Sequence, residues 1–196
     1  MKTKLILSIA ISGLLMSCSK EADLIPLKTE SDEHALTHPS EKIIPSVNTG
    51  EYATIKKYNP VPSGWVILSE DNFNNTFFIK NVAGSSTYKQ ETVIASSPIP
   101  SGWVTISKNS VFNTMIIENL NGSSVNTQKE VLKSSEIPAG WVITEQNNVF
   151  QTYIIRNLNG SPAGTYVTAL RFSTVPPGWI IISENMVYNT FILKKL

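Results

Sequence analysis

The stretch Pro62-Ser63-Gly64-Trp65 leads into the apolar run Val66-Ile67-Leu68, and three close copies of it follow in this 196-residue chain. The copies are Pro100-Ser101-Gly102-Trp103, Pro138-Ala139-Gly140-Trp141 and Pro176-Pro177-Gly178-Trp179. Their tryptophans are the only four in the chain, and each follows the last after 38 residues. A strict period of this length is the signature of a repeat architecture.

The composition around this motif is typical of β-structure. From residue 47 onward, β-branched and aromatic residues form short runs separated by Gly, Pro, Asn and Ser. One unit predicts strands at 141–145, 149–158 and 165–172, with a turn at Asn147-Asn148. Asn-Gly, at 121–122 and again at 159–160, predicts a tight hairpin turn. We therefore expect an all-β domain over residues 47–196 with three strands in each unit.

The two ends of the repeat region each look like half a unit. The last unit stops at Leu196, while residues 50–60 resemble the missing half, because Ile55, Val93 and Val131 fall at the same place in the period. We expect the two half-repeats to complete one unit and close the domain into a toroid of four 38-residue repeats with pseudo-fourfold symmetry. Closure removes exposed strand edges, and the sequence shows none of the polar end caps of an open repeat array.

The type of toroid depends on the strand count. Three strands per unit cannot form one continuous antiparallel barrel, because an odd count reverses strand direction at each step. Either each unit is its own small sheet, or a further short strand makes the count even. Both faces of the 149–158 strand are largely apolar, as in sheets that are covered on both sides. A propeller-like ring is the first expectation, and a barrel-like or prism-like closure is the second.

The N-terminus carries the features of a secretory signal. Lys2 and Lys4 precede an apolar run that ends at Leu15, too short to span a membrane as a helix. Leu15-Met16-Ser17-Cys18 resembles the lipobox of bacterial lipoproteins, and the resemblance covers only about the first eighteen residues. It implies that residues 1–17 are a signal peptide and that Cys18, the only cysteine, carries a lipid that anchors the chain in a membrane.

The segment behind Cys18 predicts where that anchor lies. The polar run 19–23 resembles the export signals of surface lipoproteins of the Bacteroidota, which implies the outer membrane and the cell surface; a periplasm-facing orientation is the alternative. Residues 18–46 hold three lysines against six acids without an apolar period, so we expect a disordered tether. His34 and His38 lie there without a third ligand, and we expect no metal site.

The composition argues against catalysis and against nucleic acid as a partner. The repeat region has a net charge of only +2 and no basic stripe. No histidine or cysteine follows His38, which excludes Ser-His and Cys-His nucleophile pairs and the usual zinc sites. The acids near the first turn of the units, Glu70, Asp71, Glu145 and Glu184, are typical of a solvated surface. We expect a protein that is not an enzyme and holds no cofactor.

Residues that recur in every unit are the candidate ligand-binding residues. A repeated indole can stack on a sugar ring, and amide and hydroxyl groups can bind its hydroxyls. The candidates are Trp65, Trp103, Trp141, Trp179, Asn75, Asn113, Gln151 and Asn189, with the adjacent threonines 76, 114, 152 and 190. The competing interpretation, which we favour for tryptophan, is structural: the indole packs between units, and Asn-Thr pairs form buried hydrogen bonds.

Two functional hypotheses follow from these patterns. In the first, the domain is a lectin-like binding module of the cell envelope that captures a glycan through several equivalent shallow sites. In the second, it is a protein-interaction or inhibitor scaffold, with contacts made by non-repeating loops such as 85–89 and 161–164. The second hypothesis predicts one aromatic or apolar patch that breaks the fourfold repeat.

Overall fold

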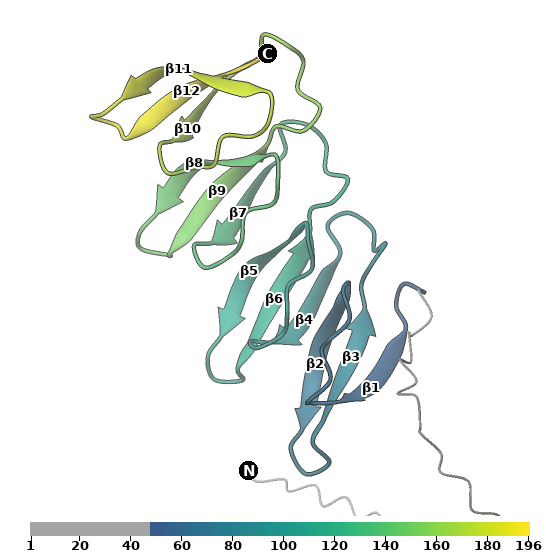
Figure 1. Cartoon of the computed structure of the whole chain (residues 1–196). Helices are drawn as coiled ribbons and strands as arrows, with labels where there is room; N and C mark the ends of the chain where they lie inside the picture. The colour runs from purple at the N-terminus through teal and green to yellow at the C-terminus, as the bar shows by residue number, and fades with distance from the viewer. Residues whose placement is uncertain (1–47) are drawn as a thin grey trace, which may run out of the picture. The chain divides into compact units, whose positions relative to one another are not determined.

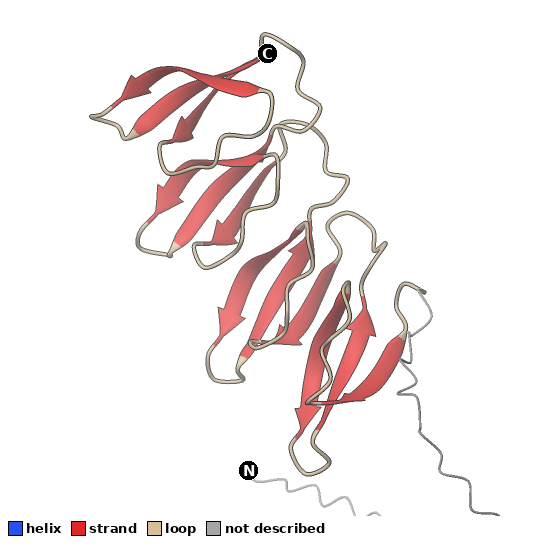
Figure 2. Cartoon of the chain, viewed as in Figure 1, coloured by secondary structure: helices blue, strands red, loops and turns tan. Residues whose placement is uncertain are grey.

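The computed structural model describes residues 48–196, which contain strands and loops and no helix (Figure 2). Residues Ile43–Leu196 form one compact unit. The expected signal peptide, the lipid site at Cys18 and the tether all lie outside the described residues. Within residues 48–196 there is no helical segment with the length and apolar character needed to cross a bilayer.

The described residues form four antiparallel sheets of three strands each. In every sheet the last strand in sequence lies in the middle, so the orders are β1-β3-β2, β4-β6-β5, β7-β9-β8 and β10-β12-β11 (Figure 1). The strands are β1 (Tyr52–Lys56), β2 (Trp65–Asp71), β3 (Thr76–Asn81), β4 (Gln90–Ile94), β5 (Trp103–Asn109), β6 (Thr114–Asn119), β7 (Gln128–Leu132), β8 (Trp141–Asn147), β9 (Thr152–Asn157), β10 (Tyr166–Leu170), β11 (Trp179–Asn185) and β12 (Thr190–Lys195). The all-β prediction and the fourfold repetition are confirmed.

The strand pairing corrects the expected boundary between units. β1 pairs with β3, and β10 pairs with β12, so each sheet is complete within one consecutive stretch of chain. The prediction that the two terminal half-repeats complete one unit is wrong. A 38-residue period does not show where a unit begins. The strand that precedes the tryptophan strand pairs with the strand that follows it, as β4 does with β6 and β7 with β9.

Contacts between sheets follow the order of the chain. The edge strands β2 and β4, β5 and β7, and β8 and β10 lie against each other. Within residues 48–196 no contact joins the first sheet to the last one. The described residues therefore make no contact that would close the expected ring.

Two local predictions also need correction. The long strand expected at 149–158 begins only at Thr152, because Asn147 opens a turn that continues to Gln151. The Asn-Gly pairs do not close hairpins either. The strands on both sides of Gly122, β6 and β7, belong to different sheets. The Asn-Gly turn therefore connects one unit to the next.

The apolar core lies largely between consecutive sheets. In the first of these contacts, Val66 and Val82 of one unit pack with Val93, Trp103 and Ile117 of the next. Equivalent clusters gather around Trp141 and Trp179. Trp103, Trp141 and Trp179 are thus placed where one sheet meets the preceding one, as the structural interpretation of the motif predicted, while Trp65 packs mainly against Ile67 and Ile79 of its own sheet.

One polar contact recurs at all three boundaries. A backbone N–H of the edge strand donates to a serine hydroxyl of the following unit, which satisfies a group that would otherwise be buried without a partner. The pairs are Ile67 N–H to Ser97 Oγ (2.8 Å), Thr105 N–H to Ser135 Oγ (2.9 Å) and Ile143 N–H to Ser173 Oγ (2.9 Å). The repeat region therefore carries its own apolar cores and its own polar clamps, which are the properties of a domain that folds by itself.

Candidate functional site

The four tryptophans are buried and offer no face to a ligand. Only 3–6% of each side chain is exposed. The glycine before each one explains the tight approach. Gly102 has φ of +81°, and a Cβ atom there would collide with the side chain of Asn121. The expectation that tryptophan stacks on a sugar is therefore wrong, and the packing role stands in its place.

The four polar residues proposed as ligand contacts have a backbone role that accounts for their recurrence. Each has a positive φ between 50° and 54°, a conformation that asparagine tolerates better than most residues. Each carbonyl also accepts a hydrogen bond from the residue that follows the first strand of its sheet. For Asn113 the donor is Ala95 N–H at 2.9 Å, and for Gln151 it is Lys133 N–H at 2.9 Å. Asn75, Asn113, Gln151 and Asn189 therefore close the hairpins, and their side chains lie at the exposed tips.

The four hairpin tips share one type of turn. The last residue of the second strand is Asp or Asn, and its side-chain oxygen accepts hydrogen bonds from the N–H groups two and three residues later. In the first unit Asp71 Oδ1 accepts from Phe73 N–H (2.9 Å) and Asn74 N–H (3.0 Å). Asn109, Asn147 and Asn185 accept equivalent bonds at 3.0–3.2 Å. Such Asx turns hold the tip in one shape.

These turns present large apolar side chains to solvent. Each of the side chains named next exposes 70% or more of its surface. They are Phe73; Val111 and Phe112; Val149 and Phe150; and Met186, Val187 and Tyr188. We call this set the tip row. The four hairpins, one from each unit, lie on the same side of the repeat domain (Figure 1). Large exposed apolar side chains that are neighbours mark interaction sites, and each of the last three tips exposes two or three of them in succession.

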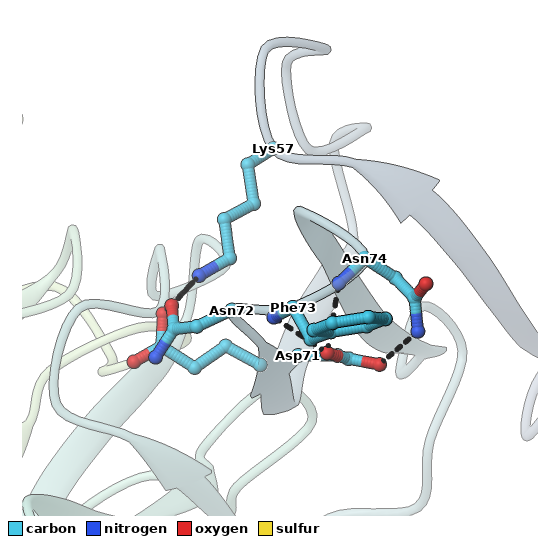
Figure 3. Close-up of polar contacts among 6 residues, drawn as sticks. Lys57, Asp71, Asn72, Phe73 and Asn74 are labelled. Carbon is cyan, nitrogen blue, oxygen red and sulfur yellow. Dashed lines mark hydrogen bonds and ion pairs between the residues drawn. The ribbon is translucent and has the colours of Figure 1, made fainter.

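Polar groups flank the apolar tips. In the first unit Lys57 lies beside the turn, with Nζ 2.7 Å from Glu70 Oε2 and 2.5 Å from Asn72 Oδ1 (Figure 3). Lys133 Nζ donates to Asn148 Oδ1 at 2.5 Å in the third unit. Each of these tips therefore combines an exposed phenyl ring with an ammonium group and an amide.

The hydrogen bonds within the first tip also set the acidity of Asp71. The backbone and side-chain amides of Asn74, followed by the Phe73 N–H and the charge of Lys57, hold the pKa of the Asp71 carboxyl below its ordinary value of 3.8. The side chain is therefore ionised in neutral solution. Its negative charge strengthens the hydrogen bonds that shape the turn.

The remaining acids near the tips are engaged in ion pairs or lie apart. Glu70 pairs with Lys57, and Glu184 pairs with Arg171 at 2.9 Å. Residues 48–196 contain no group of three or more His, Cys, Asp or Glu side chains that could hold a metal ion.

A second candidate surface lies between the third and fourth units. A groove of about 500 Å³ runs between loops 136–141 and 172–177. Phe172 lines it and packs at 5.6 Å, centroid to centroid, against Tyr153. The equivalent residue is Tyr58 in the first unit and serine in the second and third units, at 96 and 134, so an aromatic group occupies this position only in the two end units.

Backbone groups of the loops proposed as non-repeating contact sites form hydrogen bonds within the domain. The carbonyls of Ser85 and Ser86 accept from the side-chain amide of Asn119, which is buried. Gly164 N–H donates to Lys195 O at 2.9 Å. Asn81 and Asn157 repeat the role of Asn119, and their fixed position just before the inter-unit turn was a signal that could have identified them.

Comparison with known proteins finds no matching family model, no similar curated protein and no similar solved structure. The tip row and the groove are therefore the surfaces of the described residues that bear on function.

Proposed function

We propose that this chain is a lipid-anchored protein of the cell envelope whose repeat domain is a non-catalytic, lectin-like binding module. The tip row is the observation that carries this proposal: four hairpins on one side of the domain present large apolar side chains that expose 70% or more of their surface. Nothing in the folding of the sheets requires apolar groups there. Their recurrence in every unit therefore points to binding.

A glycan is the ligand class that this chemistry fits best. An exposed phenyl or phenol ring can cover the apolar C–H face of a sugar, while neighbouring amide and ammonium groups donate to its hydroxyls. Phe73 with Lys57 and Asn72, and Phe150 with Lys133 and Asn148, supply such combinations. A row of equivalent sites also suits a ligand that itself repeats, as a polysaccharide does, because linked weak contacts add up to avidity.

The proposed location follows from the N-terminal sequence. Lipid on Cys18 would hold the chain in the outer membrane, and residues 19–46 would separate the repeat domain from the bilayer. A domain that binds glycans would then lie at the cell surface, with the periplasmic orientation as the alternative. Binding needs only the individual tips, so a propeller-like or barrel-like closure of the ring is not part of the proposal.

The test is a glycan array probed with residues 43–196 and with a four-tip variant that carries Phe73→Ser, Phe112→Ser, Phe150→Ser and Tyr188→Ser. All four side chains are exposed, so each change should alter the free energy of unfolding by no more than about 0.5 kcal/mol. We expect the native domain to bind at least one glycan class and the variant to lose at least about tenfold in affinity, since each lost ring contact is worth about 0.5–1.5 kcal/mol.

The matched control replaces exposed aromatic residues at the opposite ends of the sheets, with Tyr52→Ser, Tyr88→Ser and Tyr166→Ser. It should bind as the native domain does. Glycan binding that survives in the four-tip variant would exclude the tip row. A native domain that binds no glycan on the array would exclude the ligand class.

The groove beside Phe172 supports a second candidate function, a contact with an envelope protein. It is lined by the apolar residues Ile137, Ile143 and Val175 as well as Phe172. Cross-linking from position 172 in intact cells would test it: we expect one protein partner that is lost in Phe172→Ser. Capture of no protein, or an unchanged partner in that variant, would contradict it.

A further inference from the structure

The fourth sheet ends in an uncovered apolar surface. In the first three sheets the second residue of the edge strand, Val66, Val104 or Val142, is completely buried by the following unit. The equivalent Ile180 is 40% exposed, and its neighbours Ile181 and Ile182 are 44% and 46% exposed. Leu196, which corresponds to Val82 of the first unit, is also exposed. We call Ile180, Ile181, Ile182 and Leu196 the tail face.

The side chains of the tail face are apolar, like those at the equivalent internal positions. Terminal repeats of an open array ordinarily carry a polar outer surface. Here the sequence Trp179-Ile180-Ile181-Ile182 is at least as apolar as the internal Trp141-Val142-Ile143-Thr144. An edge strand with three adjacent exposed isoleucines is a template for another chain. The tail face therefore has the composition of an internal contact.

The first sheet carries the complementary residues. Ile55 occupies the position of Val93, Val131 and Ala169, which each internal boundary buries completely. Ile55 itself is only half-buried, as is Phe77 of β3 beside it. Asn59 stands where Ser97, Ser135 and Ser173 accept a backbone hydrogen bond at the internal boundaries, and it is exposed. We call Ile55, Asn59 and Phe77 the head face.

We propose that the tail face of one molecule packs against the head face of a second copy, in the same way as consecutive sheets pack within one chain. Ile180 would then contact Ile55, as Val66 clusters with Val93. Ile181 N–H would donate to the side-chain carbonyl of Asn59, as Ile67 N–H donates to Ser97 Oγ.

The charges at the two faces permit this contact. The internal boundaries carry Lys80 with Glu91, Glu118 with Lys129, and Arg156 opposite the uncharged Val167. The corresponding pair between two copies is Lys194 with Ala53, which resembles the third boundary. At this position no like charges are brought together. Such a contact joins two different surfaces, so it extends to further copies or closes a ring between them.

Analytical ultracentrifugation of residues 43–196 from about 1 µM to about 1 mM tests the proposal. We expect the native domain to form dimers and larger species as concentration rises. Ile181→Lys places a charge in the tail face, and Asn59→Lys places one in the head face; each should weaken association by about 100-fold or more. Both side chains are exposed, and thermal unfolding checks that the variants remain folded.

Mixing the two variants distinguishes this arrangement from others. Ile181→Lys retains an intact head face and Asn59→Lys retains an intact tail face, so an equimolar mixture should form a heterodimer and stop there. Val187→Lys on the hairpin tip, equally apolar before the change, should associate as the native domain does. A mixture that stays monomeric, or association that survives in Ile181→Lys, would overturn the proposal.

A native domain that remains monomeric throughout would also overturn it, and hydrogen exchange would then identify what covers the tail face. Protected amides at Ile180–Ile182 in the monomer would indicate closure within one chain. Protection only when residues 19–42 are present would identify the occupant as the N-terminal segment.

Discussion

Trp103 lies where the first two sheets meet, packed against Val66 and Val82 of the preceding unit with 3% of its surface exposed. Truncation to alanine would remove the indole and leave a cavity that the surrounding strands cannot fill. We predict that Trp103→Ala lowers the free energy of unfolding by about 3–5 kcal/mol, measured by urea denaturation of residues 43–196.

Phe112→Ala is the matched control, because this ring is 75% exposed on the neighbouring hairpin of the same sheet. It should change stability by no more than about 0.5 kcal/mol. Equal effects from the two substitutions would mean that the tryptophan is not an anchor between units.

Asp71 supports a prediction about pH. Hydrogen bonds from Asn74 and Phe73 lower its pKa in the folded protein below 3.8. A lowered folded pKa stabilises the turn above the unfolded value, and this stabilisation is lost as the pH falls through the folded value. We predict that the amide resonances of Phe73 and Asn74 titrate with a midpoint below 3.8 in an NMR pH series.

Asp71→Asn should remove that titration and keep the turn, since Asn109, Asn147 and Asn185 form the same turn in the other units. The Val111 and Phe112 amides provide an internal control that should not follow the same curve. A midpoint at or above 3.8 would contradict the assigned hydrogen bonds.

The sequence predicted some of these single-residue roles and missed others. Pro-x-Gly-Trp indicated a packed indole, because glycine allows close approach and tryptophan fills a large volume. The tips were missed because Val149 and Phe150 extend an apolar run into the next strand. Only the Asx turn, which depends on the conformation of Asn147, separates them from it.

The first two boundaries between sheets each carry an ion pair, and the acid and the base exchange places between them. Lys80 Nζ lies 2.5 Å from Glu91 Oε1 at the first boundary, and at the second Lys129 Nζ lies 2.5 Å from Glu118 Oε1. Burial alone would lower the pKa of Lys80, but the hydrogen bond and the charge of Glu91 outweigh it and raise that pKa. Glu118 is completely buried, and its carboxylate pairs with Lys129 and accepts a hydrogen bond from Gln90.

We predict that Lys129→Met lowers the free energy of unfolding by about 3–5 kcal/mol, because it leaves a buried carboxylate without its counter-ion. The double variant Glu118→Lys with Lys129→Glu recreates the arrangement of Lys80 and Glu91 and should recover most of that loss. Urea denaturation measures both. A double variant no more stable than Lys129→Met would show that the pair is not interchangeable between boundaries.

The strands were largely predictable, and their partners were not. β-Branched runs between glycine and proline located the Trp141–Asn147 strand to within a few residues, because that signal is local. The pairing of β1 with β3 depends on contacts between residues 20 to 28 positions apart in the chain. A repeat can be divided at any point of its period, so periodicity alone left both the unit boundary and the ring closure undetermined.

The repeat domain as a whole brings four similar tips to one side, and this arrangement carries the proposed function. Four separate shallow sites can bind a polymer strongly only if several engage it at once. A single deep site in one unit would behave differently, since three of the four tips would then be dispensable.

The most direct test measures the affinity of residues 43–196 for the glycan that binds most strongly on the array, in its polymeric and short oligosaccharide forms. The series replaces one, two, three and four of Phe73, Phe112, Phe150 and Tyr188 by serine. The tip-row account predicts that polymer affinity falls by about threefold to tenfold with each replacement, in whichever order they are made, while the oligosaccharide is bound weakly throughout. An affinity that depends on one tip alone, or on none of them, would contradict it.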